Sequence, residues 1–431
     1  MTSSGRETLI DEAITGPLGR IAAMLFLTWG GLAHFDAFDF PPVVATLFAL
    51  LPIGLLFLAH QVHLRHMLVS IPAVLLLMWI TLSISWTEDF ARTTFLVRIE
   101  VPFLLGFMIC GALLSERAVT QGLLWMVRAG VALSALATVA IPSTRAAVRT
   151  TGDVFEGWHA LFEHKNAFGP FLALAFAIVL VAEDRRLVRN LTLVVIGVLI
   201  LGSQSVTALT TALVVLALFY WLRVNRGLDG PAAAAAIIGS AAVAITGALG
   251  ARASLPLFLE ATGKDPTFSG RTDIWSAVIG AIRDRPIVGY GRGGLFFAPA
   301  NEETVLLWRE IGFDPPHAHN GVLDIWLQLG IVGTVLYLLL FASTIRVSVD
   351  SYLRGERFGM LGLLVMAMIF VAALSEPLFL GPYLSVAVLI NVTGLRLNRA
   401  ERLRQIREFT HDPADEETTG QNPASASGAW S

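Results

Sequence analysis

Two histidines near the end of a long polar segment are of a type suited to proton transfer. His317 and His319 lie in the run Pro315-Pro316-His317-Ala318-His319-Asn320, directly before an apolar stretch. A neutral imidazole, with an unperturbed pKa of about 6.5, can accept a proton from a hydroxyl group. A metal site would normally show i, i+4 spacing with nearby Glu or Cys ligands, and this run shows neither. A histidine that only hydrogen-bonds backbone at a helix start is the structural alternative, and the spacing does not separate the two.

A basic residue at a predicted helix start could bind a phosphate. In Ser269-Gly270-Arg271-Thr272-Asp273, Ser269 or Thr272 can cap a helix whose apolar residues then recur at helical spacing. Free backbone amides beside the Arg271 guanidinium suit a phosphate or diphosphate. The amphipathic pattern also predicts a helix lying along the outer membrane interface, where Arg271 could instead reach lipid headgroups.

Further polar residues stand out from their apolar surroundings. The pair Arg285-Pro286 should end the helix. The following run, Gly289-Tyr290-Gly291-Arg292-Gly293-Gly294, permits positive φ and close approach of the backbone to a ligand, although a tight surface turn explains it equally well. Ionisable residues inside apolar segments are costly and suggest function. They are Arg98, Glu100, Arg128 and Asp324, and for Arg128 pairing or snorkelling within the bundle is favoured.

The composition places these residues in a membrane protein. Of 431 residues, 55% are hydrophobic and 15% charged, and the mean hydropathy is +0.69, whereas a soluble domain carries about 25% charged residues. The net charge of −3 gives no support for a nucleic-acid partner. Cys110 is the single cysteine, so no intramolecular disulfide, thiolate metal cluster or cofactor is expected. The N-terminus lacks the pattern of a secretory signal, so the first apolar block is expected to be retained as a span.

Apolar blocks long enough to cross about 30 Å of hydrocarbon predict an all-α polytopic membrane protein with about twelve transmembrane helices. With that number, the arginine-rich short connections all lie on one side, which the positive-inside rule makes cytoplasmic. The least certain pair of spans is joined only by Gly202-Ser203-Gln204-Ser205, and a single broken span there would change the parity. The predicted spans are residues 20–36, 41–59, 67–86, 96–114, 121–141, 166–183, 187–204, 206–223, 231–250, 321–345, 358–375 and 378–395.

The same pattern predicts three parts. Residues 1–19 form a cytoplasmic N-terminus, and residues 20–396 form the transmembrane domain. This domain includes a large extracytoplasmic loop at residues 251–320, whose balanced charges and scattered aromatic residues indicate a folded segment. Residues 397–431 are expected to be a cytoplasmic and largely disordered tail, because their far end is acidic and rich in small polar residues.

A set of motifs follows in a fixed order along the second half of the chain. They are Ser269-Gly270-Arg271, Ile274-Trp275, Asp284-Arg285-Pro286, Gly289-Tyr290-Gly291, His317-Ala318-His319-Asn320 and Leu323 to Gly333, preceded by His164-Lys165-Asn166-Ala167-Phe168-Gly169 and Ser203-Gln204-Ser205. This order resembles the O-antigen ligase and O-antigen polymerase superfamily, most closely its exopolysaccharide polymerase branch. The resemblance implies a multi-pass glycosyltransferase of the bacterial inner membrane, of GT-C-like architecture, with its active site facing the periplasm.

The resemblance also implies roles for individual residues. His319 matches the family's His-Asn motif and would be the catalytic base, while Arg271 matches its Gly-Arg motif and would act on the diphosphate. Many ligases have Ser-Arg where this chain has Ser203-Gln204, so one diphosphate-binding arginine is missing, and Lys165 or Arg98 could supply the charge. This departure slightly favours a polymerase. No metal is expected, and the remaining candidate substrate-binding residues are His317, Arg292 and Asn320.

The expected reaction joins undecaprenyl-diphosphate-linked oligosaccharide repeat units into exopolysaccharide or O-antigen. Its partners would be that glycan donor, a glycan acceptor, membrane lipids and other polysaccharide-assembly proteins. One alternative is an O-antigen ligase that transfers the glycan to lipid A core. An alternative of another class is a polytopic transporter or lipid-linked-oligosaccharide exporter, which could draw an anionic diphosphate through a cavity. The concentration of distinctive residues on one face favours the enzyme.

Overall fold

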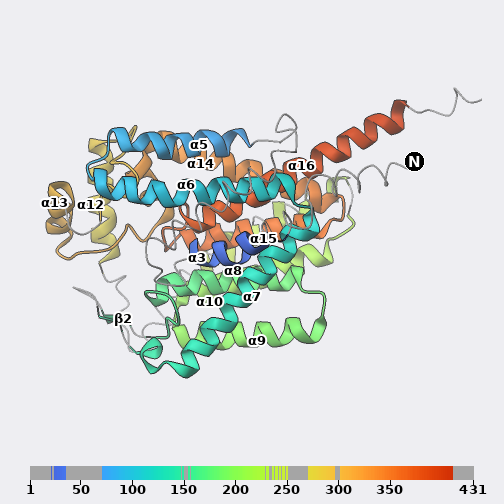
Figure 1. Ribbon diagram of the computed structural model, residues 1–431, viewed down its shortest axis with the longest axis horizontal. Helices are drawn as coiled ribbons and strands as arrows, with labels where there is room; N and C mark the ends of the chain where they lie inside the picture. Colours follow the sequence, from blue (N-terminus) through green and yellow to red (C-terminus); the bar gives the residue numbers. More distant parts are fainter. Residues whose placement is uncertain are drawn as a thin grey trace, which may run out of the picture.

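The protein is a bundle of long helices, most of which run along the same direction (Figure 1). The computed structural model describes residues 21, 24–34, 70–146, 157–228, 270–296 and 301–406, most of residues 230–250, and the backbone of two short strands and of the last helix to residue 410. The elements are η1 (Phe26–Gly30), α3 (Gly31–His34), α5 (Ile71–Leu82), η4 (Ser83–Ser85), α6 (Phe90–Leu113), α7 (Glu116–Ala140), η5 (Pro142–Arg145), β1 (Val148–Arg149), β2 (Val154–Phe155), α8 (Lys165–Ala182), α9 (Arg186–Ser203), α10 (Val206–Val224), α12 (Arg271–Asp284), α13 (Glu302–Ile311), α14 (Gly321–Leu353), α15 (Arg357–Ala373) and α16 (Pro382–Thr410). The strands pair antiparallel, with Val148 opposite Phe155.

Six helices in the described part of the chain are long and apolar enough to cross a membrane: α6, α7, α8, α9, α10 and α14. Each coincides with a span expected from the sequence, so the polytopic helical class is confirmed. The helix α5 and the helix α15 are apolar but shorter, and a further apolar helix runs over Ile238–Gly247. The span expected at residues 41–59 lies outside the described residues. The total of twelve spans therefore stays a prediction.

Polar side chains cap the N-termini of several of these helices, at the positions where the apolar blocks begin. Asp89 accepts a hydrogen bond from the Arg92 amide at 2.8 Å, and Ser115 and Ser205 cap α7 and α10 in the same way. Side-chain caps satisfy backbone donors that the first helical turn leaves without partners. At the doubtful pair of spans, Gln204 takes a left-handed φ of 51° between α9 and α10. The two are therefore separate helices, as the predicted parity requires.

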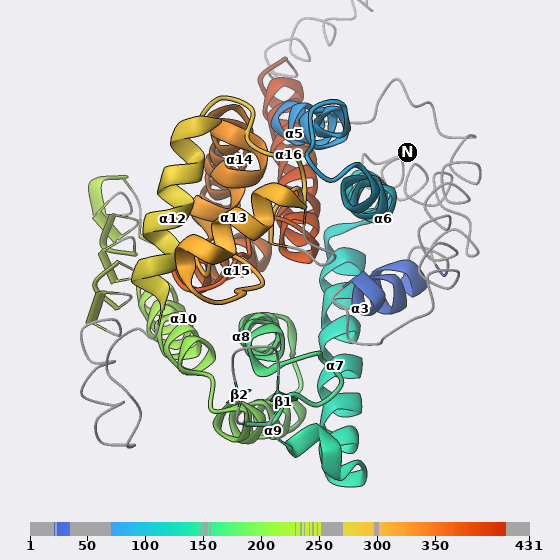
Figure 2. The same cartoon turned by 90° about the vertical axis from the view of Figure 1, so that its left-hand side faces the viewer.

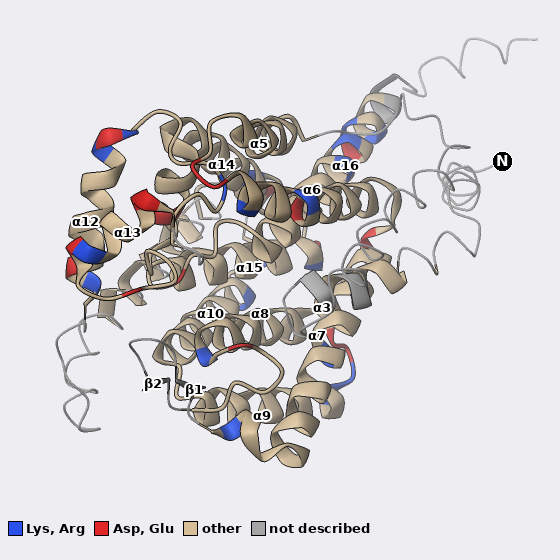
Figure 3. Cartoon of the chain, turned by 60° about the vertical axis from the view of Figure 1, so that its left-hand side comes forward, with Lys and Arg blue, Asp and Glu red and all other residues tan. Residues whose placement is uncertain are grey.

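Contacts between helix ends divide the bundle into two sides. On one side Arg396 bonds the carbonyl of Leu114, Arg226 bonds the carbonyl of Gly355, and Arg357 pairs with Asp184. On the other side the Trp158 amide donates to the Gly202 carbonyl at 2.9 Å, and the hydroxyls of Thr207 and Ser375 lie 2.8 Å apart. The arginine-rich connections thus share one side. Basic residues are also prominent along the far end of α16 (Figure 3).

The glycine-rich turn at residues 289–294 packs against a break in α14. Gly330 has φ 66° and ψ −173°, which interrupts the helix. The Tyr290 and Gly291 amides donate to the carbonyls of Leu327 and Gln328 at 3.0 and 2.9 Å, and the Trp79 indole donates to the carbonyl of Leu329 at 2.8 Å. In hydrocarbon such carbonyls must find partners within the protein. The glycines therefore permit close approach of the backbone to α14. The sequence alone was also consistent with close approach to a ligand.

The helix α12 ends before Arg285-Pro286 as its sequence predicts, but the expected cap by Thr272 is wrong, and its position along the membrane interface stays a prediction. Its N-cap is Gly270, with φ 81° and no side-chain cap, so Thr272 does not cap it, and Ser269 lies outside the described residues. A Cβ at Gly270 would collide with Phe313, which explains the glycine. The buried face of α12, formed by Ile274, Ala277, Val278 and Ile282, packs against α13 and α14 and is covered by protein. Figure 2 shows α12 and α13 lying over the end of α14.

The last helix is longer than the sequence predicted. The final span was expected to end at residue 395, followed by a largely disordered tail from residue 397, whereas α16 continues to Thr410. Residues 396–410 carry five arginines and two glutamates, and Gln405 donates to Glu401 one turn away at 3.2 Å. Such i, i+4 pairs stabilise an exposed helix. The acidic remainder of the tail lies outside the described residues.

The topology can be tested with single cysteines at the two ends of the bundle. After Cys110→Ala, we expect Arg309→Cys on α13 to react with an impermeant maleimide in intact cells, whereas Arg186→Cys on α9 should react only after lysis. Both positions are exposed in the protein, so accessibility to reagent should depend on the membrane alone. The reverse labelling pattern would show that the protein has the opposite orientation in the membrane.

The break in α14 predicts a stability effect. Gly330→Ala would place a Cβ against the carbonyl of Ile287 in a backbone region essentially reserved for glycine. Strain of this kind costs about 1–3 kcal/mol, so the melting temperature in detergent should fall clearly. Gly197→Ala in α9 is the matched control, because nothing lies within 4 Å of its added Cβ. Alanine at position 197 should be neutral or stabilise the protein by up to about 1 kcal/mol. Equal effects of the two substitutions would contradict the predicted strain at Gly330.

Candidate functional site

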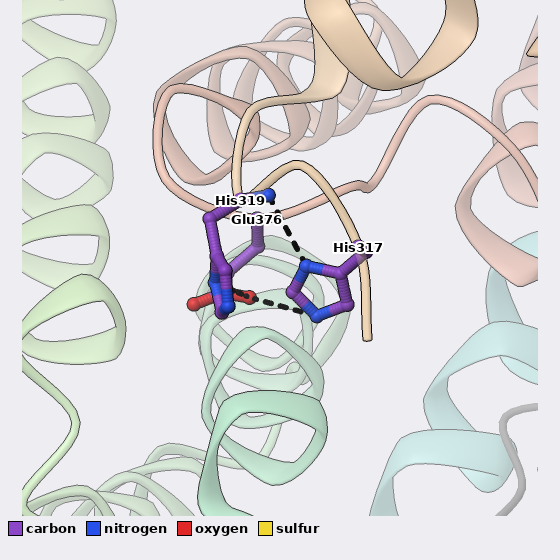
Figure 4. A group of neighbouring side chains, drawn as sticks. All are labelled: His317, His319 and Glu376. Atoms are coloured by element: carbon purple, nitrogen blue, oxygen red, sulfur yellow. Dashed lines mark hydrogen bonds and ion pairs between the residues drawn. The ribbon is translucent and has the colours of Figure 1, made fainter. Parts of the chain in front are cut away.

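A cluster of three titratable side chains lies where two connections meet at one end of the bundle. His317 and His319 belong to the segment between α13 and α14, and Glu376 to the segment between α15 and α16. Figure 4 shows both imidazoles facing the Glu376 carboxylate. The Glu376 side chain is 3% exposed, against 17% for His317 and 12% for His319. The carboxylate is therefore buried beneath two histidines that keep some access to solvent.

The distances place one carboxylate within reach of three basic groups. Oε2 of Glu376 lies 3.7 Å from Nδ1 of His319 and 3.9 Å from Nε2 of His317. Oε1 of the same group lies 3.9 Å from Nη2 of Arg271, the first residue of α12. The ring centroids of the two histidines are 4.0 Å apart. The pair His319 and Arg271, proposed from the sequence as base and diphosphate ligand, is thus brought together by the fold.

The backbone between the histidines constrains their roles. The His319 amide donates to Nδ1 of His317 at 3.2 Å, so a neutral His317 carries its proton on Nε2, which faces Glu376. His319 has φ 48°, in the left-handed region that side chains other than glycine rarely adopt. Strained residues of this kind concentrate at functional sites. Nδ1 of His319 faces the Glu376 carboxylate.

Burial sets the charge states in the cluster. Burial lowers the pKa of His317 well below its ordinary value, and the neighbouring charge of His319 lowers it further. Burial also raises the pKa of Glu376, against the opposing influence of His317, Arg271 and His164. Because the pKa of His317 is lowered, this imidazole stays neutral at pH 7.

The cation Lys165 is positioned by a helix start near the cluster. Lys165 is the first residue of α8, and His164 before it acts electrostatically on both Glu376 and His317. The start of α8 therefore brings its positive helix-dipole end toward the same region. That Lys165 binds an anionic part of the substrate stays a prediction.

Three other predicted site residues have different surroundings. Arg98 is exposed on α6, with its guanidinium 5.7 Å from the centre of the Phe95 ring. The side chain of Asn320 caps α14 by accepting hydrogen bonds from the amides of Val322 and Leu323 at 3.0 and 3.1 Å. Arg292 is buried and paired with Glu100. Their part in substrate binding stays a prediction, and the hydrogen bonds of Arg292 and Asn320 show structural roles for both.

Glu376 is the site residue that the sequence analysis missed. It follows an apolar block in Leu374-Ser375-Glu376-Pro377, more than fifty positions after the histidines. Its local sequence resembles an ordinary end of a span, and only the fold brings it to His319. An acidic residue at the edge of a span is nevertheless costly to bury, and that cost was the signal available in the sequence.

The cluster also has the composition of a metal site. One ligand atom from each of His317, His319 and Glu376 lies within 4.8 Å of the others. Two imidazoles and a carboxylate are ligands that zinc accepts. Glu376 supplies the third ligand that the sequence did not reveal, so the argument from a missing ligand no longer holds. The positive charge of Arg271 beside the same carboxylate disfavours binding of a metal cation there. Metal independence stays a prediction.

The fold and site define a polytopic helical membrane protein with a histidine–carboxylate–arginine cluster at one end of its bundle. Residues 191–338 match the family described as O-antigen ligase, a segment that contains Arg271, His317 and His319. This match confirms the resemblance predicted from the motifs.

Similarity to individual proteins points the same way. The chain is 30% identical over 224 residues to exopolysaccharide production protein ExoQ of Rhizobium meliloti, an alignment that covers 48% of each protein. It is 34% identical over 80 residues to a Rickettsia conorii protein with the provisional name of polysaccharide ligase, covering 17% of this chain and 19% of that protein. The chain thus spans about half the length of the first relative and about a fifth of the second. These similarities support the ligase and exopolysaccharide branch of the family.

Metal independence predicts that the purified protein holds no stoichiometric divalent ion. EDTA should leave the melting temperature unchanged, because the Arg271 charge already faces the Glu376 carboxylate. Metal content can be measured by mass spectrometry on wild type and Glu376→Gln. About one divalent ion per chain in the wild type, lost in Glu376→Gln, would contradict the prediction.

Proposed function

We propose that this protein is a metal-independent glycosyltransferase that polymerises glycan repeat units carried on undecaprenyl diphosphate at the periplasmic face of the bacterial inner membrane. The observation that carries the proposal is the arrangement of His319, Glu376 and Arg271, with a partly exposed base, a buried carboxylate and a guanidinium in one cluster. The family match and the relationship to an exopolysaccharide production protein support the reaction class.

In the proposed reaction the donor supplies its own leaving group. An acceptor hydroxyl oxygen forms a bond to C1 of the donor sugar while the bond from C1 to the diphosphate oxygen breaks. The hydroxyl proton passes to the imidazole of His319, and the electron pair of the broken bond stays on the undecaprenyl diphosphate. Glu376 stabilises the resulting imidazolium through Nδ1, 3.7 Å away. One such displacement inverts the configuration at C1.

Positive groups at the start of two helices would hold the leaving group. Arg271 begins α12 and Lys165 begins α8, and both starts lie toward Glu376. Fixed donors aimed at developing charge are worth more in a water-poor site than in water. We assign Arg271 to the diphosphate directly and Lys165 to the charge that an arginine at position 204 supplies in many ligases.

A ligase is the second candidate, because the matching family is described as O-antigen ligase and the Rickettsia relatives carry a ligase name. The greater length of the match to the exopolysaccharide production protein favours the polymerase. None of these relatives supports the transporter considered from the sequence.

The test supplies purified protein with an undecaprenyl-diphosphate-linked repeat unit alone and separates the products by length. A ladder of lengths supports the polymerase. Product that forms only after lipid A core is added identifies the ligase, and no product with either acceptor contradicts both.

Variants of His319 and Arg271 should separate proton transfer from donor binding. We expect His319→Ala to lower turnover by roughly 10² to 10⁴ while donor affinity stays near wild type, the usual effect of losing a general base. Arg271→Lys should weaken both, because an ammonium does not reproduce the bidentate contact of a guanidinium with phosphate. Lys165→Ala should mainly weaken donor binding. Turnover and lipid-donor affinity are measured in one detergent.

The matched control is His159→Ala, in the connection before α8. In the described part of the chain, the His159 ring bonds the carbonyls of Phe162 and Ser143 at 2.7 and 3.3 Å, which are structural contacts. It should change stability and leave turnover per folded molecule unaltered. Full activity of a well-folded His319→Ala protein would eliminate the proposed base and direct attention to His317.

A further inference from the structure

A second polar group lies buried behind the histidines and takes no part in the reaction proposed above. Nε of Arg292 donates to both carboxylate oxygens of Glu100 on α6, at 2.9 and 3.1 Å, and Nη1 donates to Oε1 of Gln328 on α14 at 2.5 Å. The side chains of Arg292 and Glu100 are 11% and 9% exposed. The sequence predicts Arg292 as a substrate-binding residue, but in the structure its guanidinium hydrogen-bonds Glu100 and Gln328.

The contacts continue in one direction toward the site. Oε1 of Gln328 also accepts from the amide of Gly293 at 2.9 Å, so this oxygen is fully used and the amide nitrogen must point the other way. That nitrogen donates to Oδ2 of Asp324 at 2.6 Å. Asp324 in turn accepts a hydrogen bond from the backbone amide of Ala318. The series Glu100, Arg292, Gln328 and Asp324 thus ends on the residue between the two histidines.

Ala318 is held from two sides. Its amide bonds Asp324 of α14, and its carbonyl accepts from the Trp275 indole of α12 at 3.0 Å. Its side chain is fully buried. The adjacent His319 has φ 48°, a conformation that costs free energy and persists only where surrounding contacts enforce it. Fixing both peptide groups of Ala318 is a direct way to enforce it.

The same series lies close to the connection that carries Glu376. A Cβ added at Gly381 would lie 4.0 Å from Oε1 of Glu100, and Gly381 belongs to the segment between α15 and α16. Although burial acts to lower the pKa of Arg292, Glu100 holds that pKa above its ordinary value, so Arg292 stays charged between its acceptors. A fully hydrogen-bonded polar network of this kind gives one defined geometry.

We propose that Asp324, oriented through Gln328 by the Arg292–Glu100 pair, is a positioning residue that sets the backbone of Ala318 and so aims His319 and His317 at Glu376. This role rests on the proposed function, and it goes beyond that function because none of the four residues contacts the reacting atoms. It also explains why ionisable residues as costly as Glu100 and Asp324 occur in spans α6 and α14.

The test uses an exchange of the carboxylate and amide between positions 324 and 328. In Asp324→Asn the new amide group cannot accept from both Gln328 and Ala318 in the native geometry, so one of these bonds is lost. In the double variant Asp324→Asn/Gln328→Glu every contact has a donor and an acceptor again. The carboxylate introduced at position 328 accepts from Arg292, from Gly293 and from the amide nitrogen introduced at position 324, while the amide oxygen at position 324 accepts from Ala318. The net charge of the group is preserved.

The control is Asp350→Asn at the opposite end of α14. Asp350 accepts from the side-chain amide of Asn398 at 2.8 Å, so the substitution and the type of partner match those at Asp324. We expect Asp324→Asn to lower kcat about 10- to 100-fold with little change in donor KM, since a displacement of about 1 Å can cost that much. The double variant should recover most of this loss, and Asp350→Asn should resemble wild type.

A second readout does not need the reaction. Diethyl pyrocarbonate modifies neutral histidines, and mass spectrometry of full-length protein in detergent gives separate rates for His317 and His319. Asp324→Asn should change the ratio of these rates, the double variant should restore it, and Asp350→Asn should not alter it. If wild type transfers no glycan but this pattern holds, the proposed function fails and the positioning role stands. Wild-type rates in Asp324→Asn, or a double variant no better than the single one, would overturn the positioning role.

Discussion

The break in α14 at Gly330 is the constraint on which the arrangement of the outer segments depends. A helix interrupted in apolar surroundings leaves carbonyls without intrahelical partners, and these must be satisfied inside the protein. Here the glycine-rich turn and the Trp79 indole supply the donors. The turn can come so close only because a Cβ at Gly289 would lie 2.6 Å from the carbonyl oxygen of Leu327. One backbone interruption thereby fixes a long polar segment onto the bundle.

The attachment of the glycine-rich turn to α14 determines where the charged side chain of Arg292 lies. It carries Arg292 into a buried position between α6 and α14, where Glu100 and Gln328 occupy its donors. The exposed end of the same assembly keeps Arg271, His317 and His319 around Glu376. The two groups of similar composition therefore differ in their contacts. Arg292 of the first group is hydrogen-bonded to Glu100 and Gln328, whereas the histidines of the second keep partial exposure to solvent.

Much of the fold was predictable because it follows from local properties of the chain. Apolar length and polar caps predict six spans that the structure contains, and Pro286 predicts the end of α12. His319 and Arg271, which both lie near Glu376, were singled out together only through the ordered family motifs, because spacing alone left a structural role for each. Glu376 and the burial of Arg292 depend on how helices pack across long sequence separations. Local periodicity carries no information about such contacts.

The partial success at α12 has a physical reason. Its 3.6-residue pattern shows that one face must be covered, and both a membrane surface and another helix can cover it. Trp308 and Phe313, which pack on the same cluster, lie well beyond the end of α12 in the sequence. Covering α12 with protein fixes Trp275, and the Trp275 indole holds the carbonyl of Ala318 beside the candidate base. If α12 rested on lipid, the position of Trp275 would not be fixed by protein packing. The hydrogen bond from Trp275 to Ala318 would then hold the backbone beside His319 less firmly.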